Sequence, residues 1–387
     1  MTDVLLFLTS LTLILIAGIF SIYISKKFKL PLPLVLFLIG FFLGNVYYYD
    51  RPIIDLSGNF LAAFSLIALS LVLFDSTSKI KFYAFDKSMQ ESLKFFIITL
   101  LLNLIVIVPA GREFFGLKLF SAIILALLLS CIEYLTIFPR HHVPKNGLTQ
   151  FLKDESLLSC AFIVFMPFLI ISTVNLLAAN PKNTLFANII IISTNIFAGI
   201  GAGIIISLII FNLINKKYFE KIASYVLAAG LLLSYVVAQQ IGGNGIVAVA
   251  TVGFIFGNVF LRHKKIIVKQ ETALYSALEV FMFMIAGIII GIPLAPKFLL
   301  AAFGIFVLYL IVRFVTSWIL LKTHNFAERV EIAFFVPKGL ATMTAAFALM
   351  NYSFMGIALL VQLIMTLFVY SLIFDTILDK FGLYKHR

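Results

Sequence analysis

Charged residues are scarce in this sequence. Asp, Glu, Lys and Arg make up 12% of the 387 residues, whereas hydrophobic residues make up 62%, and the mean hydropathy is +1.12. No soluble core needs so much apolar surface, so these values exclude a water-soluble globular protein. The apolar runs are continuous, at about 20 residues each, rather than alternating, which predicts membrane-spanning helices rather than barrel strands. The expected fold is an all-α polytopic membrane protein.

Cysteine is almost absent too, since Cys131 and Cys160 are the only two. Both fall within predicted helices, and they give neither a disulfide framework nor the spacing of a metal site. The loops hold no nucleophile–base pair, metal cluster or phosphate-binding motif, so we do not expect an enzyme or a cofactor. No segment reads as a soluble domain, and residues 1–387 are therefore predicted to form a single transmembrane unit.

Thirteen spans are predicted, and the first is expected to be a retained helix because it lacks a basic n-region and a cleavage site. They cover residues 4–24, 31–49, 58–75, 89–110, 117–138, 155–179, 186–214, 222–240, 244–261, 272–292, 297–321, 330–350 and 354–376. Of the 29 Lys and Arg residues, 22 lie in or beside alternate loops and at the C-terminus, against five in the other loops. The positive-inside rule then places the N-terminus outside and the C-terminus in the cytoplasm, in the plasma (inner) membrane.

The net charge of +12 would suggest a nucleic-acid partner in a soluble protein. Here the positive residues sit in short loops between apolar runs, where they set topology, so the lipid bilayer and not nucleic acid is the expected partner.

A weak internal repeat links the second and ninth spans. Gly40, Gly44 and Asn45 fit the pattern G-x-x-x-G-N, as do Gly253, Gly257 and Asn258. The two copies are seven spans apart, so they cross the membrane in opposite directions, which favours inverted repeats of spans 1–6 and 8–13. The alternative is two unrelated small-residue packing motifs.

Two carboxylates mark the most informative stretch. Glu133 lies inside the fifth span and Glu155 opens the sixth. A charge at the bilayer centre costs ~2.5 kcal/mol or more, so an acid within a span indicates a functional site. The alternative is that Glu133 only packs, by reaching the interface or by pairing with a Lys.

Seven short motifs follow one another in order along the chain. They are KLPLPLVLFLIG at 29–40, LFD at 73–75, DESLL at 154–158, GNGIVAV at 243–249, EVFMFMIAG at 279–287, Arg313, and VPKGL at 336–340. Their order and spacing resemble the monovalent cation/proton antiporter superfamily, in particular the thirteen-span sodium/proton exchangers of the NhaP type. The resemblance covers nearly the whole chain.

This resemblance implies a homodimer with interleaved dimerisation and core subdomains, and a monovalent cation and H⁺ as substrates. Spans 5 and 12 would be broken and would cross beside the ion site. Ser156 matches a serine that helps to bind the ion in the family. Glu155 and Lys338 are expected to pair and tie the crossing helices together. Glu279 and Arg313 are expected to pair with each other or to cap broken helix ends.

The sequence departs from the family at two places. Where the fifth span has T-D-P in the family, this chain has Ile132-Glu133-Tyr134, and the sixth-span Asn-Asp pair is replaced by Ser159-Cys160. That Asp is the ion- and proton-binding carboxylate of the family. A thiol has a pKa of about 8.5 and is a soft ligand, so Cys160 should be neutral and a poor partner for Na⁺.

Our working hypothesis is a relocated carboxylate. Glu133 would exchange the cation and the proton, with Asp75, Ser156, Ser159 and Cys160 completing the site. Burial would let Glu133 take up a proton near neutral pH, since desolvation disfavours the charged form of a carboxyl group. The alternatives are a transport-inactive relative that acts as a sensor or scaffold, and a channel or carrier for another solute.

Overall fold

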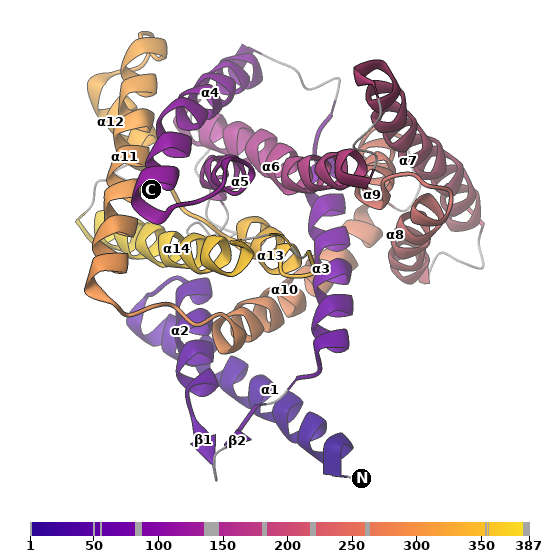
Figure 1. Ribbon diagram of the computed structural model, residues 1–387, viewed down its shortest axis with the longest axis horizontal. Helices are drawn as coiled ribbons and strands as arrows, with labels where there is room; N and C mark the ends of the chain where they lie inside the picture. Colours follow the sequence, from indigo (N-terminus) through magenta and orange to yellow (C-terminus); the bar gives the residue numbers. More distant parts are fainter. Residues whose placement is uncertain are drawn as a thin grey trace. The chain divides into compact units, whose positions relative to one another are not determined.

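A computed structural model describes residues 2–48, 51–54, 56–81, 87–134, 147–179, 184–216, 222–259, 264–352, 354 and 356–381. These residues form fourteen helices and one short hairpin, β1 (Tyr47–Tyr48) with β2 (Arg51–Pro52) (Figure 1). The helices are α1 (Thr2–Phe28), α2 (Leu32–Gly44), α3 (Gly58–Ser78), α4 (Lys87–Phe115), α5 (Leu119–Leu129), α6 (Gly147–Ala179), α7 (Leu185–Ile214), α8 (Ala223–Gln240), α9 (Gly245–Asn258), α10 (Lys264–Ile289), α11 (Pro296–Leu320), α12 (Phe326–Phe334), α13 (Leu340–Leu349) and α14 (Ile357–Lys380).

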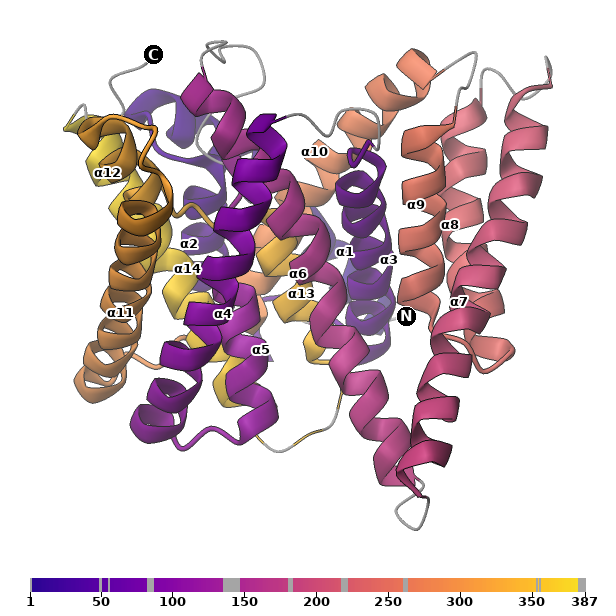
Figure 2. The same ribbon diagram turned by 90° about the horizontal axis from the view of Figure 1, so that it is seen from above.

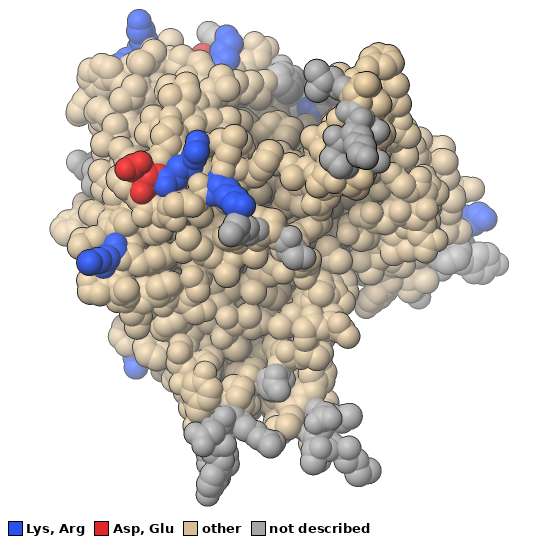
Figure 3. Space-filling view, viewed as in Figure 1, with Lys and Arg blue, Asp and Glu red and all other residues tan. Residues whose placement is uncertain are grey.

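The helices are those of a membrane protein. Eight of them are long and apolar enough to cross a bilayer, and five further apolar helices among the described residues are shorter. Every one of the thirteen predicted spans overlaps one of these segments. Large apolar side chains stay exposed along the helices, as at Ile19 in α1 and Phe186 in α7, which are 70% and 73% exposed. Figure 3 shows a face on which charged side chains are few. Lipid rather than water suits such a surface.

The chain divides into two compact units, and the first comprises Met1–Ser65, Asp86–Cys160 and Leu278–Arg387. In this unit α4 packs against α5 and α11, and α14 packs against α11, α13 and α5. All charged residues discussed below except Asp75 and its partner lie in the first unit.

The second unit comprises Leu66–Phe85 and Ala161–Ala277. Its helices α7, α8 and α9 pack pairwise and lie side by side in Figure 2. Small residues allow this close packing: Ala202, Ala238 and Ala248 are buried together, which is the usual composition of helix contacts in a membrane.

Two of the predicted spans are broken. The fifth span is helical only as α5, after which residues 130–134 leave the α-helix; its predicted end at 135–138 lies outside the described residues. The twelfth span consists of α12 and α13, separated by residues 335–339. Pro337 contributes to this break because proline lacks the N–H that a helix interior needs.

The sixth span begins earlier than the sequence predicted. Helix α6 starts at Gly147 rather than at residue 155, so Glu155 does not open the helix but lies about two turns inside it. The sequence did not predict the start of α6 at Gly147, because the residues before Glu155 are polar and charged, as in a loop.

The two copies of the G-x-x-x-G-N pattern pack in corresponding ways. A Cβ atom at Gly44 of α2 would collide with the backbone carbonyl of Ile288 in α10, within the first unit. A Cβ atom at Gly257 of α9 would collide with the carbonyl of Ser78 in α3, within the second unit. In each case a glycine lets a second helix approach at backbone distance. The second span therefore contacts the tenth, and the ninth contacts the third.

Candidate functional site

The two non-helical stretches meet in the first unit. The N–H of Glu133 donates a 2.8 Å hydrogen bond to the carbonyl oxygen of Pro337, which joins residues 130–134 to residues 335–339. A cluster of large side chains packs around this meeting point: Phe95, Ile132, Tyr134, Leu148, Phe151, Leu152, Leu321, Ile332 and Phe335. Backbone groups freed by the broken helices must find partners here, since neither lipid nor an apolar core can satisfy them.

Glu133 caps one of the broken helices. Its Oε1 atom accepts hydrogen bonds from the N–H groups of Ala341 at 2.8 Å and Thr342 at 3.2 Å. These groups lie in the first turn of α13, where N–H groups have no partner within the helix and the helix dipole favours a negative charge. Glu133 is only 8% exposed.

Lys338 caps the other broken helix. It lies between α12 and α13, and its Nζ atom donates to the carbonyl oxygens of Leu129 and Cys131 and, at 3.1 Å, to the hydroxyl of Tyr309. Leu129 is the last residue of α5, so the positive charge lies where the helix dipole is negative. The carboxylate in residues 130–134 thus caps the start of α13, and the ammonium in residues 335–339 caps the end of α5.

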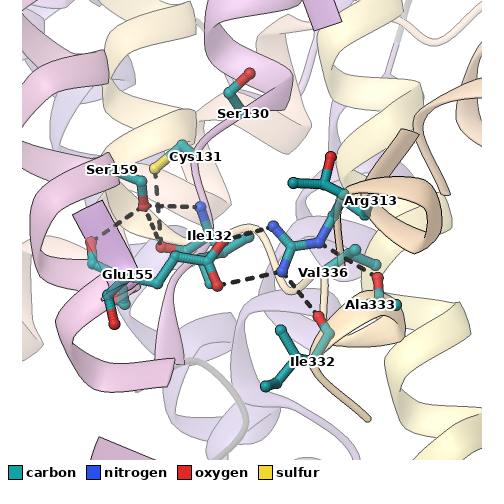
Figure 4. A network of polar contacts seen from close by, with 12 residues as sticks. Ser130, Cys131, Ile132, Glu155, Ser159, Arg313, Ile332, Ala333 and Val336 are labelled. Atoms are coloured by element: carbon teal, nitrogen blue, oxygen red, sulfur yellow. Dashed lines mark hydrogen bonds and ion pairs between the residues drawn. The ribbon is translucent and has the colours of Figure 1, made fainter. Parts of the chain in front are cut away.

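The expected pair of Glu155 and Lys338 is wrong. Glu155 of α6 pairs instead with Arg313 of α11, with distances of 2.6 Å from Nη1 to Oε1 and 3.3 Å from Nη2 to Oε2 (Figure 4). Both side chains are 1% exposed or less. The Lys338 ammonium already bonds to the carbonyl groups at the end of α5. In addition, a planar guanidinium binds a carboxylate through two parallel hydrogen bonds, which an ammonium cannot do.

Arg313 also reaches the end of α12. Its Nη2 donates to the carbonyl of Ile332 at 2.9 Å and its Nε to that of Ala333 at 3.3 Å, as Figure 4 shows. Arg313 therefore does not pair with Glu279, but the second expected role, the capping of a broken helix, is observed. Glu279 is half-buried on α10 and its charge acts on Glu133.

The serines of α6 hold the broken stretch of the fifth span. The Ser156 hydroxyl accepts the N–H of Tyr134 at 3.0 Å, and the Ser159 hydroxyl accepts that of Ile132 at 3.3 Å. The Cys160 thiol donates to the carbonyl of Ile132 at 3.1 Å. These predicted residues of α6 are therefore gathered beside Glu133, in the same unit.

Two thiols and one carboxylate come together at this point. The Sγ atoms of Cys131 and Cys160 are 3.3 Å apart and form no disulfide. The two Sγ atoms and a carboxylate oxygen of Glu133 all lie within 4.8 Å of one another, and all three residues are buried. The spacing along the sequence did not indicate this cluster, because the break in the fifth span turns Cys131 toward α6.

Asp75 is the predicted site residue that stands apart. It belongs to the second unit, where it forms an ion pair with Lys79, the residue that follows the end of α3. Its participation in the Glu133 site stays a prediction.

Three residues of the crossing escaped the sequence analysis. Asp375 of α14 lies near the end of the last predicted span, yet it is fully buried and its Oδ1 accepts the N–H of Val336 at 3.3 Å. Ser371 accepts the N–H of Lys338 at 3.1 Å, and Tyr309 bonds the Lys338 ammonium. Asp375 could have been found, since it follows a long apolar run and an acid there requires a partner. The serine and the tyrosine carry no such signal.

Comparison with known proteins agrees with this architecture. The family model described as "Sodium/hydrogen exchanger, transmembrane" matches residues 11–380. The "Probable Na(+)/H(+) antiporter 2" of Methanocaldococcus jannaschii is 24% identical over an alignment of 369 residues that covers 89% of this chain and 84% of that protein. The structure of the sodium proton antiporter MjNhaP1 from the same organism, at pH 8, superposes with a TM-score of 0.77 at 18% identity and covers 99% of both chains. This chain is therefore an integral membrane protein of the sodium/hydrogen exchanger family.

Proposed function

We propose that this protein is a secondary active transporter that exchanges a monovalent cation, Na⁺, for H⁺ by alternating access, with Glu133 as the exchanging group. The observation that carries the proposal is the buried Glu133 carboxylate at the meeting point of the two broken helices. It lies beside Cys160, which occupies the place of the family's ion-binding Asp.

The chemistry of exchange requires that a proton and a cation compete for one group. A deprotonated Glu133 offers Na⁺ an anionic oxygen, and each hydroxyl of Ser156 and Ser159 has acceptor capacity for a hard cation. Protonation removes the negative charge and the reason for a cation to bind. Asp75 is proposed to assist from α3, and Cys160 to fill the place of the missing acid as a neutral group.

The remaining charges support the site rather than bind the ion. Arg313 forms an ion pair with Glu155, and the Lys338 ammonium bonds to a backbone carbonyl at the end of α5. Without these bonds the charges would be buried without partners. Glu279 is proposed as an accessory charge because it acts on Glu133. Lys338 and Arg313 fix the positions of the broken helices through these bonds.

The arrangement in the membrane is part of the proposal. It comprises a homodimer in the plasma membrane, the N-terminus outside, the C-terminus in the cytoplasm, interleaved dimerisation and core subdomains, and inverted repeats of spans 1–6 and 8–13. The corresponding glycine contacts support the repeats, since an exchange of the two repeats turns the contact of α2 with α10 into that of α9 with α3.

A second candidate function follows from the thiol at position 160. In this alternative, the replacement of Asn-Asp by Ser159-Cys160 abolishes cation exchange, and the protein either carries another solute or serves as a membrane sensor or scaffold. The buried Cys160 thiol, which bonds to a backbone carbonyl, is the observation that favours this alternative.

Proton flux in liposomes distinguishes the two. The reconstituted protein is placed under a pH gradient, Na⁺, K⁺ and Li⁺ are added in turn, and the measurement is repeated with Glu133→Gln. We expect Na⁺ to dissipate the gradient and the variant to abolish this effect. The matched control is Glu113→Gln, at an exposed carboxylate near the end of α4, which should leave the flux unchanged.

Asp75→Asn tests the assisting carboxylate in the same assay and should lower the rate without abolishing it. A wild-type protein in which no cation moves protons would refute exchange and favour the second candidate. Flux that survives Glu133→Gln would refute the role of Glu133 alone.

A further inference from the structure

In the proposed exchange Cys160 is only a neutral group in the place of the missing acid, and Cys131 has no role. These two residues are the only cysteines in the chain, they come from different elements, and the break in the fifth span brings their Sγ atoms to 3.3 Å. A buried cysteine commonly acts as a small apolar side chain, but that role does not require a buried carboxylate beside two thiols.

We infer that Cys131, Cys160 and Glu133 form a binding site for a thiophilic metal ion of the d¹⁰ class, such as Zn²⁺, Cd²⁺ or Cu⁺. The inference shares Glu133 with the proposed exchange site but does not depend on transport. A metal bound there would occupy the carboxylate and block the exchange of Na⁺ for H⁺.

The distances fit such an ion. Zn–S bonds of about 2.3 Å in a tetrahedral site place two sulfur atoms about 3.8 Å apart, with an oxygen ligand at a similar separation from each. The two sulfur atoms are 3.3 Å apart, and all three ligand atoms lie within 4.8 Å of one another. The sulfur atoms therefore need to separate by only about half an ångström to accept the ion.

The charges fit as well. Thiolates select soft cations over Na⁺, and two thiolates with one carboxylate amount to three negative charges. The ammonium of Lys338 bonds to the carbonyl of Cys131, so a divalent ion together with Lys338 balances the cluster. Glu133 keeps its cap on α13 while it binds, because an ionised carboxylate accepts several bonds at its two oxygens.

Binding follows a balanced reaction. Each thiol loses its proton to solvent as a metal–sulfur bond forms, so one divalent ion displaces two protons when Glu133 is ionised and three when Glu133 carries its proton. The hydrogen bond from the Cys160 thiol to the carbonyl of Ile132 is lost in this step, and that carbonyl oxygen or a water completes the fourth ligand position. No electron transfer is involved.

Cd²⁺ is the probe of choice, because thiolate-to-cadmium charge transfer gives an ultraviolet absorption band that alkali ions do not. The full chain is purified in detergent, kept reduced with a phosphine and titrated with Cd²⁺. We expect one ion per chain, a charge-transfer band, and the release of two protons from the thiols, with a third where Glu133 is protonated. Excess Na⁺ should not displace the ion.

The variants make the test specific. Cys131→Ser and Cys160→Ser should each weaken binding, and the double variant, which contains no cysteine, should lose the band. Glu133→Gln should weaken binding by about tenfold or more, since even an outer partner of a metal ligand contributes this much. The exposed Glu113→Gln serves as the control with unchanged affinity, and size-exclusion profiles establish that each variant is folded.

The outcomes separate this inference from the proposed function. Absence of the band in the wild-type protein, or equal binding by the cysteine-free variant, would overturn the metal site whether or not the protein transports. In liposomes that show exchange, Cd²⁺ should inhibit the wild-type flux and should inhibit the cysteine-free variant at least tenfold less, relative to its own uninhibited rate. Binding without any exchange would overturn the proposed function and leave the metal site standing.

Discussion

The fully buried Arg313 connects three helices, and its removal gives the sharpest test of the crossing. Four of its hydrogen bonds join α11 to Glu155 in α6 and to the carbonyls of Ile332 and Ala333 in α12. The change Arg313→Met keeps much of the side-chain length and removes all four bonds. It leaves the 1% exposed Glu155 carboxylate without its cation.

The expected cost follows from these contacts. A buried charge that loses its partner costs about 3–5 kcal/mol, and the two unpaired carbonyl acceptors add about 1 kcal/mol each. A loss of about 5 kcal/mol corresponds to a fall of roughly 10 °C or more in the unfolding midpoint. The assay is the heat-induced loss of the monodisperse size-exclusion peak in detergent.

The matched control is Arg112→Met at an exposed position of α4, where a change of less than about 0.5 kcal/mol is expected. Adding Glu155→Gln to Arg313→Met should recover part of the loss, because the buried negative charge is then absent. Equal midpoints for Arg313→Met and Arg112→Met, or strictly additive losses for Arg313→Met and Glu155→Gln, would refute the reasoning.

Three further substitutions test the broken helix and the glycine contacts by the same assay. Lys338→Met leaves the last carbonyl of α5 without its charged donor and should cost about 2–3 kcal/mol; a midpoint within error of the wild type would contradict the capping role. Gly44→Ala and Gly257→Ala should each lower the midpoint, because the new Cβ meets a backbone carbonyl of the neighbouring helix, at a cost of about 1–3 kcal/mol. Gly201→Ala in α7, where nothing lies within 4 Å of the added Cβ, should be neutral or stabilising by up to about 1 kcal/mol; a loss there equal to the other two would count against packing as the cause.

The helical architecture was predictable from the sequence because lipid imposes it. A span must satisfy its own backbone hydrogen bonds, so long apolar runs separated by charged loops are sufficient to place a helix in each of the thirteen segments. The starts of helices that extend beyond the membrane were not predictable. Gly147 begins α6 within a polar run, where hydropathy gives no signal.

The charged residues of the crossing were predictable, but the groups that they contact were not. Glu133 and Lys338 stand out as charges within apolar runs, and both lie at the crossing. Their contacts are with helix ends, which become available only where a helix breaks. The pairing of Glu155 with Arg313 rather than Lys338 also depends on the angle at which α11 meets α6, which one sequence does not contain. The cysteine cluster has the same origin, since it depends on the direction that Cys131 takes after α5 ends.

The glycine contacts between distant helices have a consequence for biosynthesis. Gly44 in α2 packs on Ile288 in α10, and Gly257 in α9 packs on Ser78 in α3. Between synthesis of Gly44 and of Ile288 the ribosome adds about 240 residues, which takes roughly 12–50 s at the usual rates of translation. Throughout that interval the glycine face of α2 lies in the bilayer without its partner helix. Helices made early therefore gain their partners only when the late part of the chain is made, and a polypeptide that stops before α9 leaves Gly44 of α2 and Ser78 of α3 without these contacts.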